Sequence, residues 1–442
     1  MKIVLGALAV LLVLPAVFAL LVLVWPDSDL DDAAQQTLAA QPAQVDEQEN
    51  LFNGLTGFGA PLNEEDFVAY GAHRVREINR RFALTDSSDN PGADIDFTDV
   101  WPASGASTVS QDLCNPDENP CAGYWREQRA TLDELERRHR THLQRLAHLH
   151  TLPGYAMTMT PDYRAPLPRI SDFLAVYKLR LNILGARCAA ADTRRAFDGI
   201  TTEIAFARRI LHQTHHLLRK MVAAEQLRQA LYVYAECADL AYREATTPDP
   251  VTPLTAAEMS LREPYMTMFS EAVRQLTQLS MWSSSIPPGE DVADWALRPL
   301  IKPNRSANLA FATYTTLAAI SELPPTRLQS ETPHLLATLQ VSWYEYLINP
   351  VGAILQRIAT PTGARYMYRL HDVSGLIALL NAKLELRKQN VTADGLHAAL
   401  AASAWRNPYD NGALSWDSAT QMLSFASPNG SSRANRLRHV LQ

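Results

Sequence analysis

The chain begins with a continuous apolar run from Ile3 to Val24, 22 residues without a charge. At ~1.5 Å of rise per residue, this run forms a helix of roughly 33 Å, enough to cross a hydrocarbon layer of ~30 Å. Trp25 follows where an amphipathic ring favours the membrane interface. A cleaved signal peptide is the alternative, but its apolar core is usually shorter and ends in small residues. We therefore predict an uncleaved transmembrane anchor over residues 1–25.

The charges that flank this run predict its orientation in the membrane. Lys2 and the amino terminus precede it, and four aspartates follow it between residues 27 and 32. The positive flank stays in the cytoplasm, so the rest of the chain should be exported. A composition rich in Ala, Leu and Arg, with only six lysines, is typical of a high-GC bacterium. We predict a single-pass bacterial inner-membrane protein with a periplasmic bulk, held in the lipid bilayer by residues 3–24.

Apolar positions recur at helical spacing through most of the remaining chain. Residues 26–50 are the exception, because this acidic, Gln- and Ala-rich segment has no apolar stripe and reads as an exposed tether. A Thr255–Glu258 capping box opens one helix. The other predicted helices cover residues 64–82, 124–150, 170–191, 200–242, 308–323, 334–348 and 372–388.

Two short apolar stretches near the carboxyl end, residues 413–416 and 421–425, flank a polar turn and predict a β-hairpin. The expected fold class is therefore mainly α: a transmembrane helix, then a helical-bundle body with a small C-terminal β-hairpin. The predicted parts after the tether are an acidic N-terminal region with a helix and a disulfide loop (51–122), the helical body (123–405), and the hairpin with its tail (406–442).

The four cysteines fall into two pairs of different character. Cys114 and Cys121 enclose a Pro- and Asn-rich turn, which brings them close and predicts a disulfide in an oxidising compartment. Cys188 and Cys237 lie in helical, apolar stretches. In a simple helical hairpin they would be ~50 Å apart along the axis. We expect them to be buried free thiols, unless the second helix folds back.

Charge is divided unevenly along the chain. Residues 27–121 carry 19 acidic and 4 basic residues, whereas residues 122–442 have a net charge of +7. The simplest reading is that the acidic part packs against the basic body. An isoelectric point near 6.0 and an exported location argue against a nucleic-acid partner. An envelope protein or an anionic envelope component remains the predicted partner.

Several scattered motifs resemble an uncharacterised family of single-pass proteobacterial envelope proteins. Besides the anchor, they are Glu49–Leu55, Trp101-Pro102, Cys114 with Cys121, Asn349–Gly352, His371-Asp372, the helix around Arg387, Asn407–Tyr409, Trp416-Asp417 and Leu423–Phe425. The family more often has Asp where this chain has Asn407. The resemblance implies the membrane topology and the helical content, and it implies no catalytic residue.

Histidines and basic residues cluster between residues 208 and 220. His212 and His216 stand four residues apart, but the Glu of a zinc-protease motif is replaced by Gln213. Neighbouring cations would repel a metal ion, so we predict a solvated basic face or an anion- or partner-contacting patch, with no bound metal or cofactor. The candidate residues are Arg208, His212, His216, Arg219 and Lys220.

Catalytic motifs are absent from the sequence. There is no G-x-S-x-G, S-x-x-K or Walker A pattern. The predicted function is therefore non-catalytic binding or scaffolding of an envelope component by a membrane-tethered periplasmic protein. One alternative is a periplasmic hydrolase whose site joins Glu345 to His371 and Asp372 in a deep pocket. The other is a metal-binding periplasmic protein that uses the His212 and His216 pair.

Overall fold

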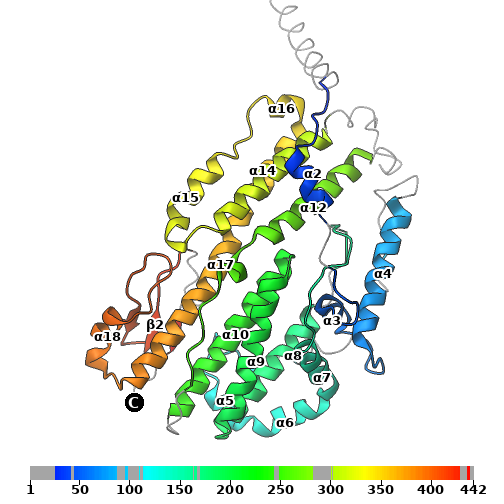
Figure 1. Ribbon diagram of the computed structural model, residues 1–442. Helices are drawn as coiled ribbons and strands as arrows, with labels where there is room; N and C mark the ends of the chain where they lie inside the picture. Colours follow the sequence, from blue (N-terminus) through cyan, green and yellow to red (C-terminus); the bar gives the residue numbers. More distant parts are fainter. Residues whose placement is uncertain are drawn as a thin grey trace, which may run out of the picture.

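The computed structural model of the protein describes residues 25–40, 44–86, 95–97, 109, 113–162, 164–166, 170–242, 248–281, 300, 302–428 and 436–438. It is mainly helical, as predicted, with a small antiparallel sheet near the carboxyl end (Figure 1). The predicted anchor over residues 3–24 lies outside the described residues. Within the described ranges, no helix combines the length and the apolar character that crossing a membrane requires.

The helices up to the end of α10 are α2 (Asp32–Ala39), α3 (Leu51–Gly57), α4 (Phe67–Asp86), α5 (Ala122–Glu127), α6 (Arg129–Arg138), α7 (Arg140–Leu149), α8 (Ile170–Ala189), α9 (Thr193–Gln213) and α10 (Leu217–Tyr242). The later ones are α11 (Ala256–Met259), α12 (Arg262–Met281), α14 (Pro303–Ser321), α15 (Pro325–Ala337), α16 (Glu345–Ile348), α17 (Pro350–Lys388), the 3-10 helix η4 (Ala393–Gly395) and α18 (Leu396–Ala402).

The start of the segment predicted as a tether is packed on the helical body. Helix α2 contacts α12 and α14, and Ala34 is buried there. The side-chain amide of Asn308, in α14, donates to the carbonyl oxygen of Asp29 at 2.9 Å. These contacts are hydrogen bonds and the burial of one small side chain, Ala34, so the sequence of this segment shows no apolar stripe. Residues 27–39 therefore differ from the free tether that their composition predicts.

The stretch predicted as one helix over residues 124–150 is divided into α5, α6 and α7. Gln128 and His139 leave helical geometry at the two junctions, with ψ near +16° and +21°. The breaks let the chain bend around α8, so that Trp125, Leu132 and Leu146 all face the core. The bends keep α5, α6 and α7 all in contact with α8.

Helices α8, α9 and α10 pack against one another as the centre of the body (Figure 1). The predicted helix over residues 200–242 breaks at Thr214, whose ψ of 133° is extended, so α10 folds back along α9. Residues at the ends of α8 and α10 thereby meet. Cys188 and Cys237 form a disulfide with a Cα–Cα distance of 5.6 Å. The expectation of free thiols is wrong, because the second helix does fold back.

Helices α12, α14 and α17 pack in sequence, and α17 also packs against α10. The 39-residue α17 begins far earlier than the predicted helix over residues 372–388. Pro361 and Gly363 within it are poor helix formers and conceal its length in the sequence. The predicted helix over residues 334–348 is also wrong, since α15 ends at Ala337 and only the short α16 follows.

The terminal hairpin is confirmed and gains a third strand. Strands β1 (Ser415–Asp417), β2 (Met422–Ser424) and β3 (Arg436–Arg438) form an antiparallel sheet in the order β1-β2-β3. Trp416, Leu423 and Leu437 are aligned across the three strands and are all buried. This alternation places one face of the sheet on the helices, since α17 contacts β2 and β3.

Candidate functional site

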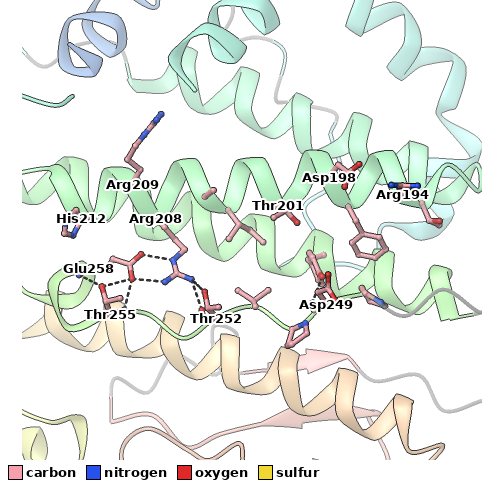
Figure 2. Close-up of a pocket in the computed structure, with 18 residues that line it drawn as sticks. Arg194, Asp198, Thr201, Arg208, Arg209, His212, Asp249, Thr252, Thr255 and Glu258 are labelled. Carbon is pink, nitrogen blue, oxygen red and sulfur yellow. Dashed lines mark hydrogen bonds and ion pairs between the residues drawn. The ribbon is translucent and has the colours of Figure 1, made fainter. Parts of the chain in front are cut away.

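A groove of about 1190 Å³ runs along α9, between this helix and the loop that follows α10 (Figure 2). Tyr234 of α10 also lines it. Helix α9 contributes Thr193, Arg194, Phe197, Asp198, Thr201, Ile204, Ala205, Arg208, Arg209 and His212. The loop and the start of α11 contribute Pro248, Asp249, Pro250, Val251, Thr252, Thr255 and Glu258.

The groove face of α9 follows from the helical repeat. Arg194, Asp198, Thr201, Ala205 and Arg208 are spaced by three or four residues and therefore form one stripe along the helix. A second stripe on the same helix, Ala196, Ile200, Ala207 and Ile210, is buried in the core. Core packing of the second stripe fixes the rotation of α9 and so presents the first stripe to the groove.

The loop wall of the groove is held by side chains that satisfy its backbone. The amide of Asn381, in α17, accepts from the N–H of Val251 at 2.9 Å and donates to its carbonyl oxygen at 2.7 Å. The hydroxyl of Tyr234 donates to the carbonyl oxygen of Asp249 at 2.6 Å. A loop has no ladder partners for these groups, so the side chains replace them. The wall is thereby fixed in place before any partner arrives.

Arg208 ties α9 to the same wall. Its guanidinium donates to both carboxylate oxygens of Glu258 at 2.7 and 2.9 Å, and to the carbonyl oxygens of Thr252 and Pro253 at 2.8 and 3.0 Å. Burial raises the pKa of Glu258, but the hydrogen bonds from Arg208 and Thr255 outweigh it and lower the pKa below its usual value. Glu258 also closes the predicted capping box with Thr255, which is confirmed. Arg208 therefore stabilises the position of the loop wall relative to α9.

The groove combines apolar side chains with charged side chains. Ala205 and Pro250 are exposed and Phe197 is partly buried, so these residues supply its apolar surface, and its exposed polar side chains have both signs of charge. Arg209 also lines the groove, but its side chain extends away from the loop wall in Figure 2 and donates to the carbonyl oxygens of Leu149 and His150. Among the described residues that line the groove there is no cysteine or serine. Such a surface can hold an apolar segment of a partner and orient it by its charges.

The predicted basic patch is not one surface, because the chain reverses at Thr214 and α10 folds back along α9, so the residues on either side of the break face different surroundings. Arg208 and His212 line the groove. His216 lies instead in a separate pocket of about 350 Å³ between α10, α12 and α17. Arg219 and Lys220 are buried, and the Lys220 ammonium donates to the carbonyl oxygen of Ser260 at 2.6 Å. Burial lowers the pKa of Lys220 to about 8.

The same break removes the geometry of the His212 and His216 metal pair. The two side chains belong to different elements and line different pockets. His216 faces the carboxylate of Glu271 at 3.9 Å, and burial together with Arg219 lowers its pKa to about 4. Among the described residues, no group of three or more His, Cys, Asp or Glu side chains is arranged to hold a metal ion.

The residues of the predicted hydrolase site do not converge. Glu345 is held by Arg305 through two hydrogen bonds of 2.7 Å. Asp372 accepts a hydrogen bond from the hydroxyl of Tyr409 at 2.8 Å, beside the buried His371. Glu345 adjoins the start of α17, and His371 lies ~32 Å further along that helix. A single pocket formed from these groups is therefore excluded.

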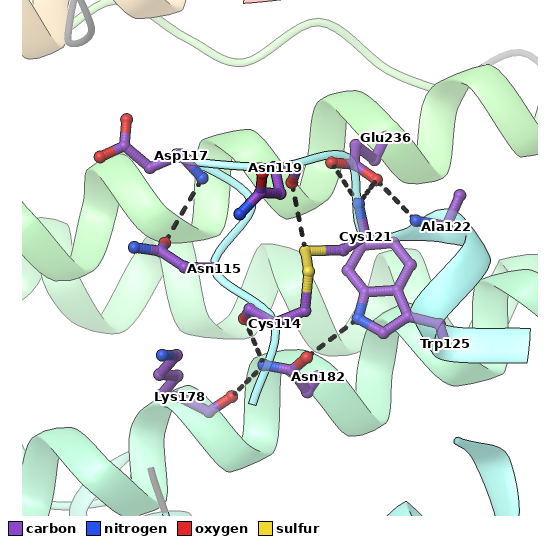
Figure 3. The surroundings of a disulfide bond; sticks show 10 residues. All are labelled: Cys114, Asn115, Asp117, Asn119, Cys121, Ala122, Trp125, Lys178, Asn182 and Glu236. Carbon is purple, nitrogen blue, oxygen red and sulfur yellow. Dashed lines mark hydrogen bonds between the residues drawn. A yellow bond between two sulfur atoms is a disulfide. The ribbon is translucent and has the colours of Figure 1, made fainter. Parts of the chain in front are cut away.

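The predicted disulfide between Cys114 and Cys121 is confirmed, with a Cα–Cα distance of 5.8 Å (Figure 3). The sequence did not predict the hydrogen bonds that hold the disulfide loop to the neighbouring helices. The Glu236 carboxylate accepts from the N–H groups of Cys121 and Ala122 at 2.8 and 3.0 Å. Asn182 joins the loop to α8 by donating to the carbonyl oxygen of Cys114 at 3.1 Å. The disulfide loop is thus fastened to both α8 and α10.

Comparison of the chain with models of protein families, with curated proteins and with solved structures finds no match in any of the three. The groove also lacked a sequence signal of its own. Its loop wall is set by Asn381, 130 residues away from Val251 along the chain. The one local signal was the Thr255–Glu258 capping box, which marks the end of that wall.

Proposed function

We propose that the protein is a non-enzymatic binding protein of the bacterial envelope, tethered to the inner membrane by residues 3–24. Its helical body lies in the periplasm and binds a segment of an envelope protein in the groove along α9. The resemblance to single-pass proteobacterial envelope proteins agrees with this cellular location. The groove is the single observation that carries the proposal.

The groove supports a polypeptide partner through its size and its polarity. Its pre-formed walls spare the complex the ordering cost that a mobile loop would add. Aliphatic or aromatic side chains of the partner pack on Phe197, Ala205 and Pro250. Charged residues beside them pair with Arg194 and Asp198 and set the direction of binding.

The two disulfides support the location outside the cytoplasm. Both pairs of cysteines are bridged, and such bonds persist in oxidising compartments and are rare in the bacterial cytosol. The bridges join α8 to α10 and close the loop before α5, so they belong to the core of the body. The two bridges therefore favour an oxidising compartment for the body.

A groove-filling variant tests the function. Ala205→Trp places an indole in the groove from an exposed position of α9. Thr202→Trp is the matched control, since Thr202 is exposed on the same helix but does not line the groove. Tagged full-length protein is cross-linked in envelopes, captured and analysed by quantitative mass spectrometry.

The wild type and T202W should enrich the same envelope protein, and A205W should lose at least roughly tenfold of it, equivalent to ~1.4 kcal/mol of binding. Equal melting temperatures of the three proteins confirm that the fold is intact. The proposal is wrong if no protein is enriched reproducibly, or if A205W captures as much as T202W.

A further inference from the structure

Large apolar side chains are exposed together at one end of the body. Trp343 and Tyr344 precede α16, and Ile354, Leu355 and Ile358 lie in the first turns of α17, which packs against α16. Trp343 is 75% exposed and Ile358 is 67% exposed. Nine large apolar side chains are exposed in the described part of the chain, and these five are more than half of them. A cluster of this kind marks an interaction surface.

The chain enters the described body at this same end. The Asp27 carboxylate accepts hydrogen bonds from the backbone N–H groups of Asn304 and Arg305 at 2.9 and 3.0 Å, at the start of α14. The Arg305 side chain in turn binds Glu345 in α16 and lies 5.9 Å from the centre of the Tyr344 ring. Figure 1 shows residues 25–31 beside α16. One residue, Arg305, thus connects the entry point with the apolar cluster.

The distance from the apolar run to this cluster is short. Only Trp25 and Pro26 separate Val24 from the fixed Asp27. Three residue steps span at most ~11 Å even when fully extended. The polar layer on each side of a bilayer is roughly 5–8 Å thick. If residues 3–24 cross the membrane, as the proposed function requires, Asp27 and the α14–α16 end of the body are held against the headgroups.

We propose that Trp343, Tyr344, Ile354, Leu355 and Ile358 form a membrane-docking surface that enters the interface of the bilayer around the anchor. The proposal rests on the anchoring in the proposed function. Trp and Tyr are the residues that favour the headgroup layer, and the aliphatic side chains gain free energy by leaving water. Arg357, exposed on the same turns of α17, is placed to meet lipid phosphates.

This docking fixes the orientation of the body on the membrane. Helix α9, with the partner groove, lies towards the opposite end from α16 (Figure 1). Seating the α16 end on the bilayer therefore leaves the groove open to the periplasm. We favour a lipid surface over a second protein as the partner of this cluster. The short link between the apolar run and Asp27 already holds the cluster close to the bilayer, so no further partner is needed to cover it.

Site-directed spin labelling of the full-length protein in lipid nanodiscs tests the surface. All four native cysteines are in disulfides, so an introduced cysteine is labelled alone. Ile358→Cys probes the surface, Trp343→Cys repeats the test on the other side of α16, and Ala419→Cys in the exposed β1–β2 turn is the control. Power saturation compares collisions with oxygen, which concentrates in hydrocarbon, and with a water-soluble nickel chelate.

The labels at 358 and 343 should show an oxygen-to-nickel collision ratio severalfold higher than the label at 419. A water-like ratio at both positions would overturn the docking surface. Labels shielded from both reagents would also overturn it, in favour of a protein partner or a second copy. Extraction of native membranes with alkaline carbonate separates the two proposals: release of the chain overturns the anchoring and the docking together, whereas retention with water-like labels overturns the docking alone.

Discussion

The carboxylate of Asp27 accepts a hydrogen bond from the backbone N–H of Arg305 at 3.0 Å, although 278 residues separate them in the chain. Asp27 thereby satisfies one of the free N–H groups at the start of α14, where the helix dipole also favours an anion. The contact couples the segment beside the apolar run to the first turn of α14. It is the structural link between the predicted anchor and the orientation of the body.

Removing this cap should cost stability in proportion to what is removed. We expect Asp27→Ala to lower the free energy of unfolding by about 1 kcal/mol. Asp27→Asn keeps an acceptor oxygen but loses the charge, so its cost should be less than half as large. Urea unfolding followed by circular dichroism measures both values. A neutral effect of D27A would mean that the contact with α14 contributes nothing to the fold.

The two disulfides should contribute unequally. In the loop-entropy model, the 49-residue separation of Cys188 and Cys237 corresponds to ~4 kcal/mol, and the 7-residue separation of Cys114 and Cys121 to ~2.5 kcal/mol. We expect C188A/C237A to lower the urea midpoint more than C114A/C121A. The reverse order would show that contacts of the small loop, such as that of Glu236, outweigh chain entropy.

Glu236 makes stability depend on pH. Burial raises the pKa of the Glu236 carboxyl group from 4.5, its value in the unfolded chain, to about 7. Hydrogen bonds from the N–H groups of Cys121 and Ala122 and the nearby charge of Lys383 lower the pKa, but burial outweighs them. Because the folded state binds this proton more tightly, its contribution to stability is present below pH 4.5 and is lost as the pH rises to about 7.

The variant Glu236→Gln removes that titration. Its unfolding free energy relative to the wild type should rise between pH 4.5 and 7, by on the order of 3 kcal/mol, and then stay constant. The buried His216 and His371, with pKa values near 4, titrate in the opposite sense but are present in both proteins and cancel. A difference that does not change between pH 5 and 7.5 would contradict this account.

Gly185 is required by close packing. A Cβ at this position of α8 would lie 2.3 Å from the ring of the buried Trp125, whereas one at Gly123 meets nothing within 4 Å. We expect Gly185→Ala to destabilise the protein by about 1–3 kcal/mol through overpacking. Gly123→Ala, the matched control in α5, should stabilise it by roughly 0.5–1 kcal/mol. Thermal unfolding of the two variants tests this, and equal shifts would contradict it.

The fold class was accessible from the sequence because helical periodicity and alternation are local signals. The helix over residues 170–191, the capping box at Thr255 and the hairpin around residues 413–425 were all predicted close to their observed places. The disulfide between Cys114 and Cys121 was equally local, since a proline-rich turn closes it. Each of these rests on neighbours within about ten residues.

The remainder depended on tertiary contacts. The break at Thr214 follows an amphipathic stretch, residues 200–213, that contains no Pro or Gly, so no local signal indicated that α10 folds back. That single break changed the state of Cys188 and Cys237 and dispersed the predicted basic patch. The groove was missed for the same reason, because Asn381 and Arg208 build its wall from distant parts of the chain.

The most direct test of the central claim, an anchored body outside the cytoplasm, is a pair of reporter fusions at the carboxyl end of the full-length chain. Alkaline phosphatase folds only in an oxidising compartment, and a standard green fluorescent protein fluoresces only when it folds in the cytosol. The account predicts an active phosphatase fusion and a dark fluorescent one, both in the membrane fraction. A fluorescent fusion with an inactive phosphatase would contradict it.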